Sequence, residues 1–518
     1  MRSLLLCLAV AMAAAFGAAG CSKKAMYARA DAPVSLKLTL GYAPSPSAET
    51  YAALVDNVAR RTSENPVSTF SIDVDTGSYA NMRRIVSQGY LPPADAVRAE
   101  EFLNYFDYGY VPPAARETPF SVTTEVAPAP WNGQRQLMLI GIKGYDVAKS
   151  EIPPANLVFL IDTSGSMSSP DKLPLVCDAI ENLLPNLRAQ DRVSIVAYAG
   201  RAGLVLEPTP GDRRDRIHAA LQSLRSDGST NGSAGIALAY TMARDAFIAG
   251  GVNRVILATD GDFNVGTTSI AELKSMVAAQ RKSGIALTTL GFGTGNYNDA
   301  LAEQLADIGN GNHAYIDSLD EARKVLGEEL SSTLLTIAKD VKIQVEFNPA
   351  LVAEYRLIGY ENRVLAREDF NDDQVDAGEI GAGHDVTALY EITLVDGDRS
   401  VDPLRYGETK ASAANDKELA YVKLRYKHPD EDTSRLIETP VARASMQAAP
   451  SERLRFAAAV VAFADLLRSG GHVGTFGYDD VARLAKDAGG DDAHGYRRQF
   501  VELVDRAAGL AGKRVSGL

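Results

Sequence analysis

The sequence predicts an α/β protein: a doubly wound, mostly parallel Rossmann-like sheet inserted between β-rich flanks and followed by a C-terminal helical region. Three observations predict this class. Near-continuous apolar runs alternate with amphipathic stretches between residues 156 and 309. Segments with strand-like alternation lie before and after that region. The residues from 448 onward consist mainly of stretches with helical spacing.

Four apolar runs supply the expected strands of the central sheet, at 156–161, 192–199, 254–259 and 285–293. Amphipathic stretches separate or follow them, at 172–184, 214–224, 233–250, 269–284 and 298–309. Strands this apolar are typical of a parallel sheet that is covered by helices on both faces. Such sheets bind ligands beyond the carboxyl ends of their strands. We therefore expect a binding site among the residues that directly follow the apolar runs.

The flanks contain strand-like segments on both sides of the central region. Alternating segments occur before it, at 120–130 and 135–147, and after the helix expected at 319–338, at 339–348, 353–362, 385–395 and 418–427. Neither group is large enough to form a protected sandwich alone. We therefore expect strands from 118–143 and 340–427 to pair across the insertion into one β-domain.

The N-terminus has the layout of a bacterial secretory signal peptide. Arg2 is followed by an apolar run from Leu4 to Phe16 and by small residues directly before Cys21. The small-residue ending before the cysteine resembles a lipobox, in which Cys21 becomes the lipidated first residue. A transmembrane anchor is the weaker alternative, because the run is shorter than the ~20 residues that a span needs. Ser22, the residue after Cys21, favours the outer membrane by resemblance to the bacterial sorting rule.

These features give the expected domain organisation. It comprises a signal peptide at 1–20, a lipidated N-terminus and flexible tether at 21–62, a flanking α+β domain at 63–150, the central α/β domain at 151–338, a β-rich domain at 339–447 and a helical region at 448–518. We expect a cell-envelope protein that meets the membrane through its lipid anchor only.

Composition excludes some classes of partner. The formal net charge of −13 argues against a nucleic-acid-binding surface, which needs a basic face. Of the three cysteines, Cys7 lies in the signal peptide, Cys21 is the anchor and Cys177 stands alone, so we expect no intramolecular disulfide in the mature chain. Cys177 lies on an apolar helical stripe and is expected to be a buried packing residue.

Oxygen-bearing side chains follow the expected strands at three places. Asp162 comes directly after the first apolar run, with Ser164 and Ser166 behind it in the pattern D-x-S-x-S. Thr230 lies in a second loop that precedes a helix, and Asp260 follows a third apolar strand. Hard oxygen ligands without cysteine or histidine suit Mg²⁺ or another hard divalent ion, and not zinc. The alternative is that Ser164 or Ser166 serves only as a helix cap.

The pattern D-x-S-x-S, the later threonine after Gly-Ser, and "TDGDFN", all on alternating strands and helices, resemble a von Willebrand factor type A domain. The resemblance implies a metal-ion-dependent adhesion site formed by Asp162, Ser164, Ser166, Thr230 and Asp260. It further implies that the hydroxyls bind the ion directly, that both aspartates act largely through water, and that a partner's Asp or Glu completes the site. Mg²⁺ is the expected ion, with Mn²⁺ and Ca²⁺ as alternatives.

The flanking segments "NPVSTFSIDVDTGSYANMRRIVSQGYLPP" and "KDVKIQVEFNPALVAEYRLIGYENR" resemble a bacterial lipoprotein family that carries such domains. This resemblance implies a lipoprotein, and the type A domain resemblance implies that it binds a protein partner through its metal site. Polar groups without a proton-transfer partner suit adhesion better than turnover, so we do not expect an enzyme. A subunit or scaffold of an envelope assembly or chaperone complex is the alternative function, and a hydrolase is a remote one.

The stretch "SIDVDTGSYA" contains an aspartic-protease-like "DTGS" at Asp75. A protease needs a second such motif to share one proton, and the sequence has none, because Ser164 replaces the required glycine in "DTSGS". A phosphatase D-x-D-x-[T/V] motif also fails, because Gly77 occupies its last position. We expect Asp75 or Thr76 to cap the helix that follows.

Overall fold

The computed structural model describes residues 48–261, 269–397, 399–401 and 416–516. The expected signal peptide, the lipidation site Cys21 and most of the expected tether lie outside the described residues. The chain divides after Pro46 into an N-terminal segment and one folded unit that begins at Ser47. The domain boundaries expected within this folded unit stay predictions.

The central sheet has six strands in the order β10-β9-β8-β5-β6-β7. Its strands are β5 (Ala155–Asp162), β6 (Arg192–Tyr198), β7 (Ala202–Pro210), β8 (Val252–Thr259), β9 (Ala286–Phe292) and β10 (His313–Ile316). All pair in parallel except β7, which is an antiparallel edge strand. Every residue of β5 is buried, as the apolar run predicts for a central strand. The expected doubly wound class is confirmed.

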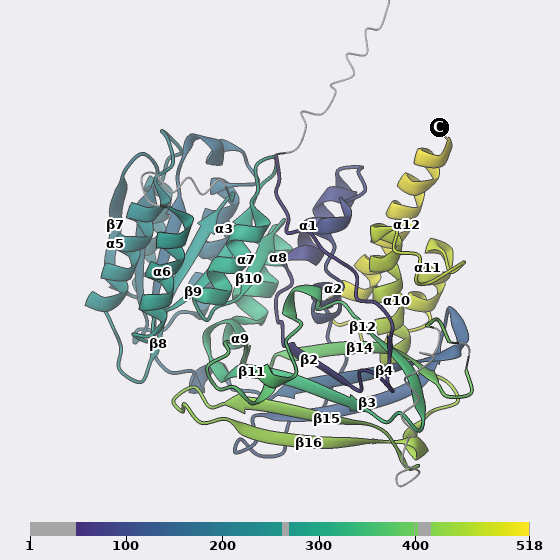
Figure 1. The fold of residues 1–518 in the computed structure, drawn as a ribbon. Helices are drawn as coiled ribbons and strands as arrows, with labels where there is room; N and C mark the ends of the chain where they lie inside the picture. The colour runs from purple at the N-terminus through teal and green to yellow at the C-terminus, as the bar shows by residue number, and fades with distance from the viewer. Residues whose placement is uncertain (1–47, 262–268, 398, 402–415, 517–518) are drawn as a thin grey trace, which may run out of the picture. The chain divides into compact units, whose positions relative to one another are not determined.

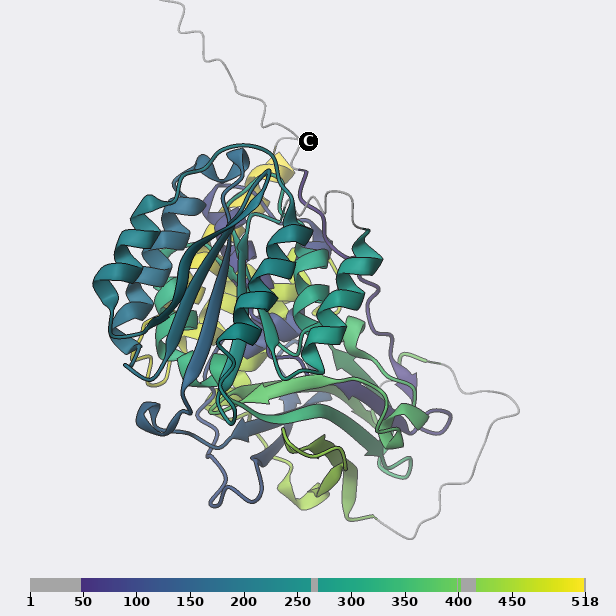
Figure 2. The same ribbon diagram turned by 90° about the vertical axis from the view of Figure 1, so that its left-hand side faces the viewer.

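Helices cover both faces of this sheet (Figure 2). They are α3 (Leu173–Leu183), α4 (Arg214–Ser223), α5 (Gly232–Asp245), α6 (Ile270–Arg281), α7 (Asp299–Ile308) and α8 (Leu319–Arg323). The short α9 (Leu330–Leu334) follows and contacts β13 (Gly378–Gly381) of the flank. On one face, Ile236 of α5 and Leu273 of α6 pack with Val158 of β5. On the other face, Val176 of α3 packs with Phe159. Alternate side chains of β5 thus pack into two separate hydrophobic cores, one on each face of the sheet.

Two five-stranded sheets form a sandwich in the flanks, in the orders β1-β12-β14-β4-β3 and β13-β11-β15-β16, with β2 also on β11. Their strands are β1 (Arg60–Arg61), β2 (Val67–Ser71), β3 (Phe120–Ala129), β4 (Asn132–Gly144), β11 (Thr336–Phe347), β12 (Val352–Ile358), β13 (Gly378–Gly381), β14 (Asp385–Leu394), β15 (Glu418–Lys427) and β16 (Arg435–Ala442). Strand β4 pairs with β14, and β2 pairs with β11. The expected pairing across the insertion is confirmed.

A helical layer covers the β4–β14 sheet on its other face (Figure 1). It contains α1 (Gly77–Ser87), α2 (Ala99–Asn104), α10 (Glu452–Arg468), α11 (Tyr478–Lys486) and α12 (Tyr496–Ser516). Phe106, Phe456 and Phe500 pack edge to face in its core. None of the helices formed by the described residues has the length and apolar character needed to cross a membrane.

Two local expectations are wrong. The helix expected at 319–338 ends earlier, because α8 passes through a π-helical turn into α9 and β11 begins at Thr336. Helix α1 lacks the expected side-chain cap, since Thr76 makes no capping hydrogen bond. The Asp75 carboxylate instead accepts the backbone N–H of His313, at 2.7 Å, and so joins α1 to the central sheet.

Buried ion pairs connect the flank helices to the central domain. Arg98, 1% exposed, bonds Asp299 at the start of α7 at 2.6 Å, and Arg83 bonds Asp317 and Glu321. Glu100 lies in the same buried layer, but its Oε2 atom has no hydrogen-bond partner among the described groups. Burial raises the pKa of Glu100 to about 8, and the charges of neighbouring carboxylates add to the effect.

This layer makes stability depend on pH in a defined direction. A carboxyl whose pKa is higher in the folded chain keeps a proton that the unfolded chain loses, so stability falls as pH rises from 4.5 to about 8. We expect Glu100→Gln to raise the free energy of unfolding by on the order of 2 kcal/mol at pH 8 and to change it little at pH 4.5. Denaturant unfolding at both pH values measures this, with the exposed Glu117→Gln as control. Equal effects at both pH values would refute it.

Candidate metal centre

Asp162 occupies the end of β5 and is fully buried. Its Oδ1 atom accepts the backbone N–H of Ser164 at 2.8 Å, and its Oδ2 atom accepts the Thr259 hydroxyl at 3.3 Å. Thr259 is the last residue of the neighbouring strand β8. The carboxylate is therefore held between the ends of two parallel strands, at the carboxyl edge where the sequence predicts a site.

The two serine hydroxyls lie beside each other. Ser164 Oγ and Ser166 Oγ are 3.0 Å apart, with Ser164 buried and Ser166 exposed. A short 3₁₀ helix (Gly165–Ser168) begins after Ser164, whose side chain makes no capping hydrogen bond. The helix-cap alternative for Ser164 is therefore not supported. Both hydroxyls remain at the rim of the sheet as oxygen donors.

The loop that carries Thr230 packs directly on the serine loop. The N–H of Gly165 bonds the carbonyl of Gly228 at 3.0 Å, and the N–H of Asp227 bonds the carbonyl of Thr163 at 2.8 Å. Gly228 adopts a φ of +80°, which a side chain would disfavour. Thr230 is half-buried, and no hydrogen bond from its side chain to another described residue is present. The backbone contacts bring its loop to Ser164 and Ser166.

Asp260 follows β8 and is also fully buried. Strand β8 pairs in parallel with β5, so Asp260 and Asp162 emerge at the same edge of the sheet. Gly261 next to it has a φ of +81°, and a Cβ there would lie 2.3 Å from the backbone nitrogen of Asn298. The glycine thus permits a close approach between this loop and residues 296–298. Residues 262–268 lie outside the described residues.

Two residues that the sequence did not identify complete the site. Lys172 Nζ lies 2.8 Å from Asp260 Oδ2 and 3.1 Å from Asn296 Oδ1. The Asn296 amide donates to the same Asp260 oxygen at 3.3 Å. The Lys172 side chain is only 7% exposed, and its methylene groups pack where Gly293 has no side chain. A buried ammonium therefore balances part of the charge of the two carboxylates.

The electrostatics of the site favour an added cation. Burial raises the pKa of Asp162 to about 6, the charge of Asp260 adds to the rise, and the hydrogen bonds from Ser164 oppose it. With both carboxylates ionised, Lys172 leaves an excess of one negative charge. A divalent cation would neutralise that excess and relieve the repulsion between the carboxylates.

The donor set fits Mg²⁺, Mn²⁺ or Ca²⁺ better than zinc, since it consists of carboxylate and hydroxyl oxygens. Among the described residues, no cluster of three or more histidine, cysteine or acidic side chains could hold a metal ion. That result agrees with the composition of this centre, in which only Asp162 and Asp260 are acidic and the other candidates are hydroxyls. The residues present therefore fit a hard divalent cation.

The Lys172 contact leads to a prediction. We expect Lys172→Met to lower the stability of the metal-free protein by about 3 kcal/mol, because a buried carboxylate loses its partner. Mg²⁺ should then raise the melting temperature more in the variant than in the wild type, because no ammonium competes for Asp260. Melting curves with Mg²⁺ and with chelator measure both effects, and the exposed Lys282→Met is the control. An unchanged or smaller Mg²⁺ shift in the variant would contradict the competition.

The two aspartates of the protease-like stretch make contacts within the folded unit. Asp75 is buried, accepts the backbone N–H of His313 and lies 3.7 Å from Arg363. Asp73 caps the same turn by accepting the Asp75 N–H at 3.0 Å. Asp75 thus joins the flank to β10 of the central sheet, and Asp73 fixes the turn that carries Asp75.

Cys177 is half-buried rather than fully buried, and burial raises the pKa of its thiol to about 11. It packs against the α3 core as the helical stripe predicts.

Comparison with protein-family models gives three matches. Residues 156–327 match the von Willebrand factor type A domain. Residues 45–139 match a model described as von Willebrand factor, and residues 332–510 match the C-terminal region of the uncharacterized protein YfbK. The type A match covers the six-stranded sheet with its helices, and the other two cover the flanks and the C-terminal helices.

Individual proteins extend the comparison. Inter-alpha-trypsin inhibitor heavy chain H3 of Homo sapiens is 26% identical over 49% of this chain and 30% of its own length. A solved von Willebrand factor type A structure from Catenulispora acidiphila covers 73% of this chain and 89% of its own, with 16% identity and a TM-score of 0.43. The uncharacterized protein YfbK of Escherichia coli is 48% identical over 90% of this chain and 82% of its own length. The chain therefore belongs to the YfbK family and contains a von Willebrand factor type A domain.

Proposed function

We propose that this chain is an envelope-tethered lipoprotein that binds a protein partner through a divalent cation. The observation that carries the proposal is the arrangement of Asp162, Ser164 and Ser166 at the end of β5 beside Asp260 at the end of β8. Thr230 is the fifth proposed ligand, from the loop that bonds to the serine loop. Mg²⁺ is the proposed ion, with Mn²⁺ or Ca²⁺ as alternatives.

The residues of the centre have separate roles in this proposal. The hydroxyls of Ser164, Ser166 and Thr230 supply neutral oxygens to the cation, while the buried Asp162 and Asp260 supply the negative charge that attracts it. When bound, the cation offers a positive centre to an outside carboxylate. A site with few anionic ligands keeps net positive charge, so an Asp or Glu of the partner is the proposed recognition group.

A role in binding is favoured over a role in catalysis. Among the described residues of the centre there is no histidine to act as a general acid or base. We therefore propose that the chain is not an enzyme. The anchor is proposed to be the lipid on Cys21, and the outer membrane is the proposed location.

Affinity capture from envelope extracts tests the proposal. The chain from residue 22 onward is immobilised and exposed to extract in Mg²⁺, with Asp260→Ala as the matched bait. We expect partners that wild type retains in Mg²⁺, that chelator elutes and that the variant does not retain. Amidation of carboxyl groups in the extract should abolish capture. Retention that is indifferent to chelator, to the variant and to amidation would reject the metal-bridged mechanism, and capture of envelope assembly or chaperone proteins would identify the alternative role.

A further inference from the structure

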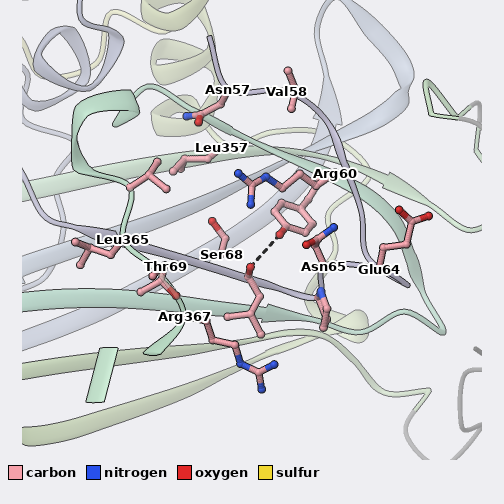
Figure 3. Close-up of a pocket in the computed structure, with 15 residues that line it drawn as sticks. Asn57, Val58, Arg60, Glu64, Asn65, Ser68, Thr69, Leu357, Leu365 and Arg367 are labelled. Carbon is pink, nitrogen blue, oxygen red and sulfur yellow. Dashed lines mark hydrogen bonds between the residues drawn. The ribbon is translucent and has the colours of Figure 1, made fainter. Parts of the chain in front are cut away.

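A second concave site lies in the flank sandwich, away from the metal centre. It is a pocket of about 300 Å³ between β2 and β12, lined by residues of both strands and of the segments 57–66 and 364–367 (Figure 3). None of the five proposed metal ligands lines it. Strand β2 pairs with β11 along one edge, and its other edge, which Phe70 bridges to Val364, forms a wall of the pocket.

The backbone of β2 presents donors to this pocket. The carbonyl of Val67 accepts the Tyr355 hydroxyl at 3.1 Å, and the carbonyl of Thr69 accepts the N–H of Leu365 at 2.9 Å. In a β-strand the N–H and C=O of one residue point to the same side. The N–H groups of Val67 and Thr69 are therefore directed away from β11, toward the pocket. Each outward carbonyl thus already accepts one hydrogen bond, and the two N–H groups supply donors on this edge.

The side chains add positive charge. Arg60 and Arg367 stand on opposite sides of the pocket (Figure 3), and neither guanidinium forms an ion pair with a described residue. Glu64, the one acidic side chain among the lining residues, is paired with Arg61 at 3.4 Å. Burial raises the pKa of Tyr355 to about 12, and the positive charge of Arg60 opposes the rise. The Arg60 guanidinium therefore interacts electrostatically with the tyrosine that lines the pocket.

Two unpaired arginines in one pocket are notable in a chain with a net charge of −13. Apolar side chains border the same pocket: Val58 is 68% exposed, Val364 is 44% exposed and Leu357 forms part of the wall. A peptide strand adding to β2 would need a free strand edge, but Phe70 of β2 is already bridged to Val364 on this side. A donor-rich, positively charged pocket with an apolar border instead matches an oxyanion on an apolar body.

We propose that this pocket binds a small organic anion, whose carboxylate or phosphate group lies between Arg60, Arg367 and the N–H groups of β2 while its apolar part contacts Val58 and Val364. The site is independent of the divalent cation. It gives the flank a binding function of its own, beyond supporting the metal-site domain.

Isothermal titration of the chain from residue 22 onward, in chelator, tests the site with hexyl phosphate, hexanoate, inorganic phosphate and hexylamine. We expect hexyl phosphate or hexanoate to bind more tightly than inorganic phosphate, and hexylamine not to bind. The tighter of the two identifies the native group as phosphate or carboxylate. Arg60→Gln and Arg367→Gln should each weaken binding by about tenfold or more.

Arg443→Gln is the matched control, because Arg443 is exposed and does not line the pocket. It should change affinity by no more than about twofold. Arg60 and Arg367 are exposed, so their substitution should not unfold the chain. Failure of all three anions to bind at millimolar concentration, or binding that Arg60→Gln and Arg367→Gln leave unchanged, would overturn the proposal.

Discussion

Asp260→Ala is expected to abolish the stabilisation that Mg²⁺ gives to the wild-type chain. A ligand that binds only the folded state stabilises it by about 2.7 kcal/mol at a hundredfold excess over Kd. For a domain of about 150–250 residues, such as the type A domain, that stabilisation corresponds to a rise in melting temperature of roughly 5–10 °C. The variant lacks one of the two buried carboxylates, so its melting temperature should be the same in Mg²⁺ and in chelator.

The metal-free variant is expected to melt below metal-free wild type. Charge repulsion with Asp162 alone would predict the opposite, but Asp260 accepts a buried hydrogen bond from Lys172 at 2.8 Å. Removing the carboxylate leaves that ammonium without its anion.

Thr230→Ala should keep part of the Mg²⁺ shift, because it removes a neutral oxygen only. Asp178→Ala, an exposed aspartate of α3, is the control. A full Mg²⁺ shift in Asp260→Ala would contradict the assignment of this residue.

Cys21→Ser is expected to release the protein from membranes, because one diacylated cysteine is the only anchor that the sequence predicts. Fractionation of cells that express the wild type and the variant measures this, with a high-salt wash to remove peripheral binding. Cys177→Ser is the matched control, because Cys177 packs against the α3 core. A variant that remains with the membrane fraction, as folded protein and not as aggregate, would disprove lipid anchoring at Cys21.

The central sheet was predictable because its strands are buried on both faces. The apolar runs at 156–161 and 254–259 correspond to β5 and β8, and their spacing from D-x-S-x-S and Asp260 placed both aspartates at one edge. Edge strands gave weaker signals. Strand β7 carries two prolines and β16 carries one, and β10 has four residues, so neither composition nor length distinguished them from loops.

The parts of the site that escaped prediction depend on tertiary contacts. Lys172 stands between polar residues and the start of α3, where a lysine ordinarily reaches solvent. Its partner Asp260 is 88 residues away in the chain, and nothing local relates the two. Asn296 likewise lies in a loop with no motif. The capping role expected for Asp75 was wrong because this side chain also makes a tertiary contact. It accepts the backbone N–H of His313 in β10, far away in the sequence.

Direct counting of bound cation tests whether the chain holds a divalent metal centre. Electron paramagnetic resonance of Mn²⁺, titrated into the chain from residue 22 onward, measures free ion and hence the number bound per chain. We expect one Mn²⁺ to bind per chain, to be displaced by Mg²⁺ and to be lost in Asp260→Ala, with weaker binding in Ser164→Ala. A wild-type chain that binds no Mn²⁺ at millimolar concentration, or an Asp260→Ala chain that binds as the wild type does, would contradict the metal centre.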